Sequence, residues 1–421
     1  MPPKPNLLLP IHLEGSHLEG GGQLLRVALG LSALTKKPIH ITNIRGKRPG
    51  GGGLKAQHLT CVQWLGQACS ARLSGVGLKS KEITFIPSPN SPSSIDSLGG
   101  DIRITQNTPG SIDLVLQAVL PFLLFSGAAG PIRLRVSGGT NVSNSPSHEY
   151  VAEVLIPMLE LIGIPRMEAQ VHSRGWSQGS TRVGSATFTI TPLTTTLPAF
   201  QLTNRGRIEH VKAIVIAPRD TERDFRDELE VMFERRAERL FGSIHANSNV
   251  DRQPGLDGEY DTEITFEDSR HEKRYYILLV ATSTTGIKLG RDWLYDQAIR
   301  PGKTERIPGT MVKKVSDDLL AEIAHGGCVD EFMRDQLLAY QALAEGRSEV
   351  RGGLHTAPSE GLTIEPSLHA KTAMWVAERM VGVEFDDGGC VGLGFDPSRH
   401  KDGEDIEDLT KEIEALNVSA S

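Results

Sequence analysis

Apolar residues recur along most of the chain at the spacings of short helices and short strands, which predicts a mixed α/β fold. Near the C-terminus they repeat every three or four positions, at Ala373, Val376, Ala377 and Met380. This spacing gives one apolar face and predicts a helix, for which Pro366 and Ser367 suit the first turn. Apolar runs at 39–44 and 132–136 predict strands.

The same order of predicted elements appears three times. Each copy has an apolar helix that contains a glutamine, then a strand, then a loop with Gly or Pro, and then a second helix with a histidine near its start. The pairs are Gln23 and His58, Gln117 and His148, and Gln336 and His369. Within every pair the histidine follows 31 to 35 residues later, so the sequence predicts a triplicated α/β unit.

The three units are not evenly spaced, and the difference predicts an inserted domain. The second interval between glutamines exceeds the first by 125 residues. We expect a small α/β domain at 205–286, before the third unit, within a discontinuous core of 1–204 and 287–421. This segment carries a charged helix at 221–240 and no cluster of catalytic residue types, so it is expected to be peripheral. The acidic end, 401–421, is expected to be a mobile tail.

His369 is a candidate nucleophile. It falls in the first turn of a predicted helix, where free backbone N–H groups and the positive end of the helix dipole favour a neutral imidazole. A neutral imidazole is a nucleophile at physiological pH, and a helix start is a place where phosphate binds. The alternative is an ordinary histidine at the start of a helix.

A glycine-rich turn precedes the first predicted helix. Glu19 is followed by three glycines, which let the backbone approach a ligand closely. The turn is neither a Walker A loop nor a dinucleotide-binding fingerprint. Glu19 is a candidate ligand for a divalent cation that bridges phosphates. The alternative is an acidic residue that only favours the helix dipole.

A positive stretch contrasts with the overall composition. The chain of 421 residues has a formal charge of −7, which argues against a generic nucleic-acid coat protein. Residues 20–81 nevertheless contain ten Lys or Arg and no Asp or Glu, as a polyanion site needs. Within it, Arg45, Arg48 and Lys55 surround four consecutive glycines, and such a loop suits a phosphate backbone. The alternative is a basic surface with no dedicated partner.

The chain is expected to be intracellular. Its four cysteines show no CxxC pattern, so a reducing compartment is expected and a disulfide framework is not. The N-terminus lacks the charged-then-apolar order of a signal peptide. No apolar run is long enough to span a bilayer, and neither a membrane nor an obligate protein partner is expected.

One predicted helix, 332–344, carries residue types that suit a nucleoside. Phe332 is an aromatic that can stack on a base, and one turn later Asp335 and Gln336 can read ribose or base edges. The alternative is that Phe332 is an ordinary core residue.

Taken together, these motifs resemble the RNA 3′-terminal phosphate cyclase family, and its eukaryotic type in particular. Five stretches carry the resemblance, in the family's order and over almost the whole chain: 18–26, 57–59, 138–146, 325–337 and 368–373. The resemblance implies three βαβαββ-type repeats similar to the C-terminal domain of translation initiation factor 3, with a small domain inserted before the third. That fold agrees with the triplication and the uneven spacing.

The resemblance also implies a reaction and a set of site residues. Members of the family use ATP and a divalent metal, Mg²⁺ or Mn²⁺, to convert a 3′-phosphate RNA end into a 2′,3′-cyclic phosphate through a covalent histidine–AMP intermediate. The nucleophile falls on His369 and the metal carboxylate on Glu19. The expected nucleotide contacts are Gln117, Pro146, Phe332, Asp335 and Gln336, with Glu19 and Arg26. The expected RNA contacts are Arg45, Arg48, Lys55, Gln57 and His58.

Three positions depart from the family's pattern. Phe332 stands where the family usually has Tyr, which keeps the stacking and loses a hydroxyl. Residues 175–180 replace a Tyr- and Gly-rich stretch, and four glycines follow Pro49 in place of Gly-Leu.

Two other functions are open at this point. A nucleolar cyclase-like relative acts in ribosomal RNA maturation as a non-catalytic RNA-binding factor, but His369, Glu19 and the Asp335–Gln336 pair favour the enzyme. An enolpyruvyl transferase of related architecture lacks support from the motifs above. The resemblance implies a nuclear location, with the cytoplasm as the alternative.

Overall fold

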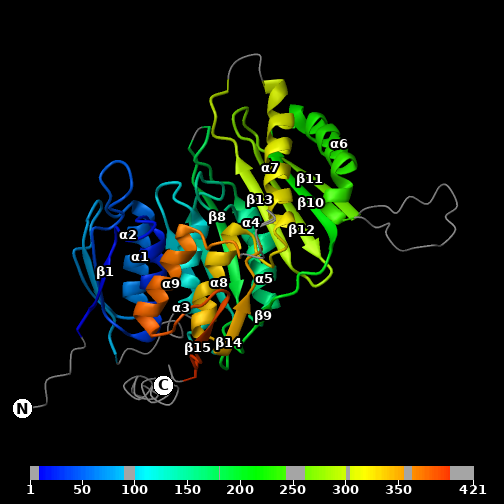
Figure 1. The fold of residues 1–421 in the computed structure, drawn as a ribbon. Helices are drawn as coiled ribbons and strands as arrows, with labels where there is room; N and C mark the ends of the chain where they lie inside the picture. The colour runs from blue at the N-terminus through cyan, green and yellow to red at the C-terminus, as the bar shows by residue number, and fades with distance from the viewer. Residues whose placement is uncertain are drawn as a thin grey trace, which may run out of the picture.

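Four small sheets make up the described part of the chain, which in this computed structural model comprises residues 9–89, 100–179, 181–242, 261–299, 304–354 and 363–398. Two of the sheets have the same order of four strands, and a third has three described strands that pair in the same parallel and antiparallel sense; Figure 1 shows all four sheets. The predicted α/β class and its triplication are confirmed. The acidic end expected to be mobile, 401–421, lies outside the described residues.

The first unit sets the pattern for the other two. Its elements are β1 (Ile11–Glu14), α1 (Gln23–Thr35), β2 (Ile39–Thr42), α2 (Ala56–Ala68), β3 (Arg72–Ser74) and β4 (Ile83–Ile86). The sheet order is β1-β2-β4-β3, with β1 parallel to β2 and β4 antiparallel to both neighbours. Apolar residues alternate along β2 and β4, so one face of this sheet packs against the helices.

The second unit repeats this order with a longer second helix. Its elements are β5 (Asp101–Thr105), α3 (Ile112–Leu124), β6 (Ile132–Gly138), α4 (His148–Tyr150), a π-helical turn (Val151–Leu155), α5 (Ile156–Leu161), β7 (Glu168–Ser173) and β8 (Gly184–Ile190). The sheet order β5-β6-β8-β7 matches that of the first unit.

The third unit is interrupted by the insertion. Its elements are β9 (Gln201–Leu202), α8 (Glu331–Leu343), β14 (Glu345–Val350), α9 (Leu368–Val381) and β15 (Gly389–Leu393). β9 pairs in parallel with β14, and β14 pairs antiparallel with β15. The insertion therefore begins after the first strand of this unit. The spacing of the glutamines had instead predicted an insertion before the unit.

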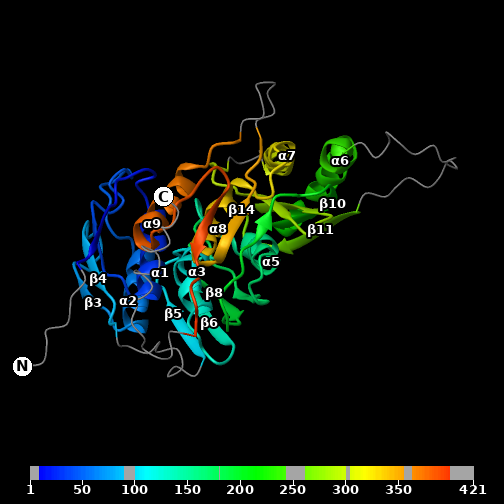
Figure 2. The same cartoon turned by 60° about the horizontal axis from the view of Figure 1, so that its bottom comes forward.

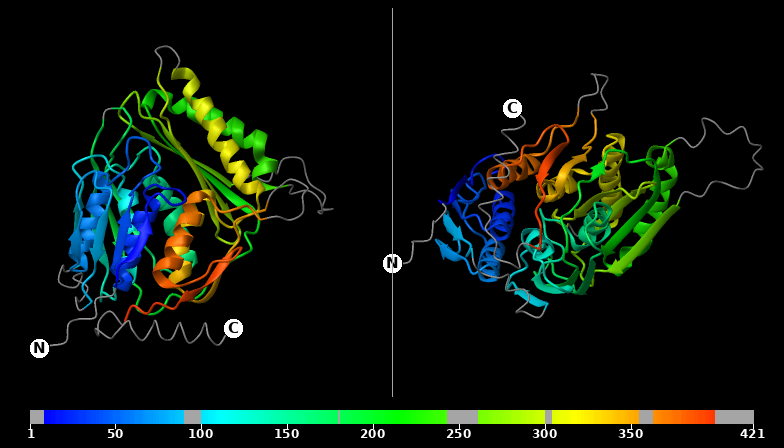
Figure 3. Two further views of the ribbon diagram at one scale, coloured as in Figure 1. Left: turned by 60° about the vertical axis from the view of Figure 1, so that its left-hand side comes forward. Right: turned by 90° about the horizontal axis from the view of Figure 1, so that it is seen from below.

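The insertion forms a fourth sheet with two helices. Its elements are β10 (Ile208–Ala217), a 3₁₀ turn (Arg219–Thr221), α6 (Glu222–Phe241), β11 (Asp261–Asp268), β12 (Tyr276–Ser283), β13 (Lys288–Leu294), a 3₁₀ turn (Thr304–Arg306) and α7 (Ile307–Ala324). The order is β11-β10-β12-β13, and α6 and α7 lie side by side over one face (Figure 3). The range 205–286 holds three of these strands, and we propose that the inserted unit extends to Ala324.

Helices of the three units pack against one another in the middle of the molecule, with their sheets outside (Figure 2). α1 contacts both α3 and α9, and α8 contacts α9. A Cβ atom at Gly30 of α1 would lie 2.9 Å from the carbonyl oxygen of Ala118, so glycine permits the close approach of α1 and α3. This packing brings the starts of α1, α2, α8 and α9 together. In the described ranges, no helix is long and apolar enough to cross a membrane.

Candidate active site

His369 lies at the exposed start of α9. Ser367 precedes the helix, and its hydroxyl accepts a hydrogen bond from the Ala370 N–H at 3.2 Å. The His369 side chain is 48% exposed, and its Nε2 lies 3.9 Å from Oε1 of Glu19. Partial burial lowers the pKa of His369; Glu19 opposes this effect, and Arg26 adds to it. The ring is therefore neutral at physiological pH.

Glu19 joins the first unit to the third. Its backbone N–H donates to Oγ1 of Thr372 in α9 at 3.2 Å, across 353 positions of sequence. Its side chain is 5% exposed and forms an ion pair with Arg48. Oε2 accepts from the Gly21 N–H at 2.7 Å. A Cβ atom at Gly21 would overlap the Glu19 carboxylate, so this part of the predicted glycine-rich turn needs glycine.

The carboxylate of Glu19 can bind a metal ion only together with ligands from the substrate. In the ranges that the structure describes, no group of three or more His, Cys, Asp or Glu is placed to hold a metal ion. Mg²⁺ is usually bound through one or two carboxylates together with substrate phosphates. Glu19 therefore suits a cation that arrives with phosphate, and a metal centre made by protein alone is not formed by the described residues.

Arg26 joins glutamines from two units. Its Nε donates to Oε1 of Gln117 at 2.7 Å, and its Nη2 donates to Oε1 of Gln23 at 2.8 Å. Gln117 Nε2 also donates to Gln23 Oε1, at 3.3 Å. Arg26 is 8% exposed, and it lines a pocket beside this cluster. That pocket lies between α1, α3 and α8, and the residues that line it include Arg26, Gln117, Asp335, Gln336 and Tyr340.

The pocket brings together candidates from all three units, but the glutamine register differs among them. Gln117 and Gln336 are both the sixth residue of a 13-residue helix. Gln23 is instead the first residue of α1, which also has 13 residues. Gln117 and Gln336 therefore occupy the same position in their helices, as the repeat predicted. Gln23 does not, and it reaches the cluster from the start of its helix.

Asp335 and Gln336 are engaged with each other. Gln336 Nε2 donates to Asp335 Oδ1 at 2.8 Å. Burial raises the pKa of Asp335 to about 7, against the lowering effects of the Gln336 hydrogen bond and of Arg26. At neutral pH this carboxyl is therefore partly protonated and can donate as well as accept a hydrogen bond.

Phe332 is exposed, so the core alternative for this residue is wrong. Phe332 is the second residue of α8 and is 42% exposed. The guanidinium carbon of Arg291 lies 4.8 Å from the centre of its ring, and Tyr150 meets it edge to face with ring centres 6.0 Å apart. Pro146, another of the expected nucleotide contacts, is half-buried in the loop that precedes α4.

The basic loop lies beside Glu19. Arg48 and Lys55 are exposed, and Arg45 is half-buried, with Nη1 donating to the Gly53 carbonyl oxygen at 3.2 Å. Gln57 Oε1 accepts from the Ser111 N–H at 3.3 Å, which ties the start of α2 to the second unit. The predicted RNA contacts at Arg45, Arg48 and Lys55 therefore face solvent at least in part, and Gln57 already has a partner.

The other two helix-start histidines are buried. His58 is 3% exposed, its Nδ1 accepts from the Lys55 N–H at 3.2 Å, and burial lowers its pKa to about 3. His148 is also 3% exposed, with its Nδ1 3.7 Å from Oδ1 of Asp113. The predicted placement of all three histidines in a first turn is correct, and His369 is the exposed one of the three.

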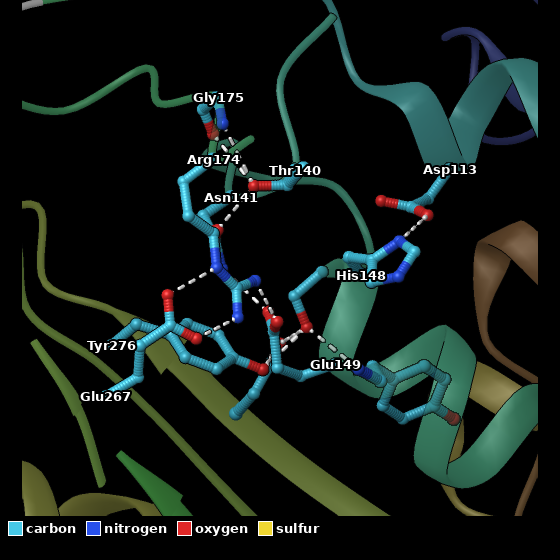
Figure 4. A network of polar contacts seen from close by, with 12 residues as sticks. Asp113, Thr140, Asn141, His148, Glu149, Arg174, Gly175, Glu267 and Tyr276 are labelled. Atoms are coloured by element: carbon cyan, nitrogen blue, oxygen red, sulfur yellow. Dashed lines mark hydrogen bonds and ion pairs between the residues drawn. The ribbon is translucent and has the colours of Figure 1, made fainter. Parts of the chain in front are cut away.

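A polar network that sequence reasoning did not find joins the second unit to the inserted sheet (Figure 4). Arg174 pairs with Glu149 of α4 and with Glu267 of β11. Asn141 Nδ2 donates to Glu149 Oε2 at 2.9 Å, and the Gly175 carbonyl oxygen accepts from the Thr140 and Asn141 N–H groups, both at 2.9 Å. The segment 175–179 is thus hydrogen-bonded to the loop that carries Pro146. Its sequence offered no signal, because the partners lie on separate units.

The chain is similar to one family over almost its whole length. A family model described as RNA 3′-terminal phosphate cyclase matches residues 17–386. The RNA 3′-terminal phosphate cyclase of Drosophila melanogaster is 32% identical over 401 residues, which cover 91% of this chain and 97% of that protein. That of Pyrococcus furiosus is 30% identical over 385 residues, with 91% and 96% covered. That of Staphylothermus marinus is 33% identical over 343 residues, with 80% and 86% covered.

Proposed function

Because the chain belongs to the RNA 3′-terminal phosphate cyclase family, we propose that it converts the 3′-phosphate end of RNA into a 2′,3′-cyclic phosphodiester at the expense of ATP. The proposed reaction passes through a covalent AMP adduct of His369. The observation that carries this proposal is the exposed His369 ring, 3.9 Å from Glu19. Arg26, which lines the pocket with Gln117, Asp335 and Gln336, is near enough to help lower the pKa of His369.

In the first step, a ring nitrogen of His369 attacks the α-phosphorus of ATP. A phosphorus–nitrogen bond forms, the bond from the α-phosphorus to the bridging oxygen breaks, and diphosphate leaves. The neutral ring has the lone pair that this attack needs, because its pKa is lowered. Arg26 and Arg48 supply positive charge near the polyphosphate.

The second and third steps transfer AMP and close the ring. An oxygen of the RNA 3′-phosphate attacks the phosphorus of the adduct, the phosphorus–nitrogen bond breaks, and His369 is regenerated. The neighbouring ribose 2′-hydroxyl then attacks the RNA phosphorus, AMP leaves, and the hydroxyl proton passes to solvent. Ring closure is intramolecular, so the reacting groups lose no translational entropy in coming together.

The proposed nucleotide and RNA contacts are those that the family resemblance implies, and their positions support them in part. Phe332 offers an exposed ring for stacking on the adenine, with Pro146 as the second candidate for base contact, and Asp335 and Gln336 supply hydrogen-bonding groups for the ribose or base. Glu19 would hold a divalent metal together with ATP phosphates, and the metal would supply positive charge that offsets phosphate repulsion. The loop of Arg45, Arg48 and Lys55, with Gln57 and His58 behind it, would hold the RNA end.

The test is cyclisation of an RNA labelled in its 3′-phosphate. With ATP and Mg²⁺ or Mn²⁺, the label is expected to become resistant to alkaline phosphatase, and one AMP and one diphosphate should appear per protected end. The His369→Ala variant should protect none. An RNA that binds but stays fully sensitive to phosphatase would refute the enzyme and support a non-catalytic RNA-binding factor.

A further inference from the structure

Strand β13 of the inserted sheet lies against two parts of the proposed nucleotide site. Three consecutive residues, Gly290, Arg291 and Asp292, contact the start of α8 on one side and the residue after Pro146 on the other. The segment that was expected to be peripheral, 205–286, ends before this strand begins.

Gly290 fixes the start of α8. Its N–H donates to Oδ2 of Asp330 at 2.7 Å. The other oxygen of Asp330 accepts from the N–H groups of Phe332 and Met333, at 3.0 and 2.8 Å, and thereby caps α8. Tyr150 also donates to Asp330, at 2.6 Å. A Cβ atom at Gly290 would lie 2.9 Å from the Tyr150 ring, so glycine is needed for this close approach.

Arg291 covers one side of Phe332. Its guanidinium carbon lies 4.8 Å from the ring centre, a favourable distance for a cation above an aromatic face. Ion pairs with Glu322 and with Glu331, the latter at 3.0 Å, hold the guanidinium in place, and its side chain is 17% exposed. Because Phe332 is itself 42% exposed, Arg291 limits the orientations of a ring that would otherwise be free to turn.

Asp292 holds the loop that carries Pro146. Its Oδ2 accepts from the Ser147 hydroxyl at 2.7 Å and from the Tyr276 hydroxyl at 3.0 Å. Ser147 directly follows Pro146, and its hydroxyl oxygen also accepts from the Tyr150 N–H at 3.1 Å, at the start of α4. One carboxylate on the inserted sheet thus fixes the end of this loop.

We propose that β13 of the inserted sheet sets the spacing between Pro146 and Phe332 and so positions the two residues that hold the adenine of ATP. Arg291 is the main positioning residue, acting through the ring of Phe332. This inference rests on the proposed function, because it concerns the same nucleotide site. It assigns to the insertion a role in binding the base and none in holding the phosphates.

The experiment measures nucleotide binding without chemistry. α,β-Methylene-ATP cannot be cleaved at the bond that adenylylation breaks, and its Kd is obtained by titration calorimetry with the full-length chain. Inorganic tripolyphosphate, which has no base, is titrated in parallel. The variants are Arg291→Gln and Gly290→Ala, and the matched control is Lys288→Gln, which also replaces a cation of β13 by an amide. Circular dichroism checks the fold of each variant.

Arg291→Gln is expected to bind α,β-methylene-ATP about tenfold more weakly, as loss of a desolvated cation–aromatic contact implies. Its Kd for tripolyphosphate should stay within twofold of the wild type, and Lys288→Gln should match the wild type for both ligands. Arg291→Lys keeps a cation over the ring and should bind the analogue more tightly than Arg291→Gln. Gly290→Ala should show the same selective loss without a change of charge.

Two results would overturn the inference. The first is an unchanged Kd for α,β-methylene-ATP in folded Arg291→Gln protein, and the second is an equal loss for the analogue and for tripolyphosphate. Neither result depends on catalysis. A wild-type protein that binds the analogue but forms no adduct would refute the proposed function alone.

Discussion

Replacement of His369 by alanine is expected to abolish the protein–AMP adduct and to leave the stability of the fold almost unchanged. The side chain is 48% exposed, and its charged neighbour Glu19 lies 3.9 Å away. The lowered pKa keeps the ring neutral at physiological pH, so this pair contributes little to stability. The free energy of unfolding should change by less than about 0.5 kcal/mol, as for other exposed positions.

His148 provides the opposite case within the same repeat pattern. Its ring is 3% exposed and packs beside Phe188, with ring centres 5.6 Å apart. Truncation to alanine leaves a cavity and should lower the free energy of unfolding by about 3 kcal/mol, the lower end for loss of a buried ring. The adduct should still form, because His148 is buried and is not the proposed nucleophile.

The assay pairs labelling with thermal unfolding. ATP labelled on its α-phosphate is incubated with each protein, and label is recovered under neutral denaturing conditions, since a phosphorus–nitrogen bond is labile to acid. Release of AMP by mild acid then identifies the bond. Differential scanning calorimetry supplies the unfolding midpoint, which should fall for His148→Ala and stay constant for His369→Ala.

A His369→Ala protein that still becomes labelled would refute the assignment of the nucleophile. Loss of labelling in His148→Ala protein that keeps the wild-type unfolding midpoint would refute the argument from burial. His58→Ala should keep the adduct as well, because His58 is buried and is not the proposed nucleophile. Loss of labelling in folded His58→Ala protein would contradict the assignment of that role to His369 alone.

Three further predictions concern the cations, the buried acid and the metal. Alanine at Arg45, Arg48 or Lys55 should weaken RNA binding and reduce its slope against log salt by about 0.7 per removed contact; an unchanged slope in a filter-binding salt series would leave the loop as surface charge. Between pH 4 and 7 the folded chain binds a proton at Asp335 that the unfolded chain does not, because its pKa is raised to about 7. The stability of the wild type should therefore fall with rising pH relative to Asp335→Asn, and parallel curves from denaturant titrations would contradict this. Glu19→Gln should raise the Mg²⁺ concentration for half-maximal adduct formation by about tenfold or more, from the lost charge interaction; an unchanged metal dependence would remove Glu19 as the ligand.

The order of elements and the region of the site could be predicted from the sequence because both depend on local signals. Alternating apolar residues mark the strands, and glycine-rich turns and a proline mark the helix starts that carry Glu19 and His369. These starts meet because three similar units pack through their helices. The position of a residue within its helix could not be predicted, because a shift of the helix start by a few residues leaves the apolar face nearly unchanged. Gln23, which begins its helix, is the example.

The contribution of β13 could not be predicted for a different reason. Arg291 and Asp292 pair with Leu279 and Leu278 of β12, and this register decides which part of the core each side chain meets. Alternation in the sequence shows that two neighbours point to opposite faces, but it does not show what lies against either face. The same limit applies to Arg174, whose partners are Glu149 on helix α4 of the second unit and Glu267 on strand β11 of the inserted sheet.

The interrupted third unit has a consequence for the order in which the chain matures on the ribosome. Phe200 at the edge of β9 donates its N–H to Ser348 of β14, 148 positions later. At about 5–20 residues per second, β9 leaves the ribosome roughly 7 to 30 seconds before its partner strand. The first two units and the inserted sheet have their local partners during that interval, whereas the third unit does not. His369 of α9, the proposed nucleophile, therefore joins the fold after the first two units and the inserted sheet.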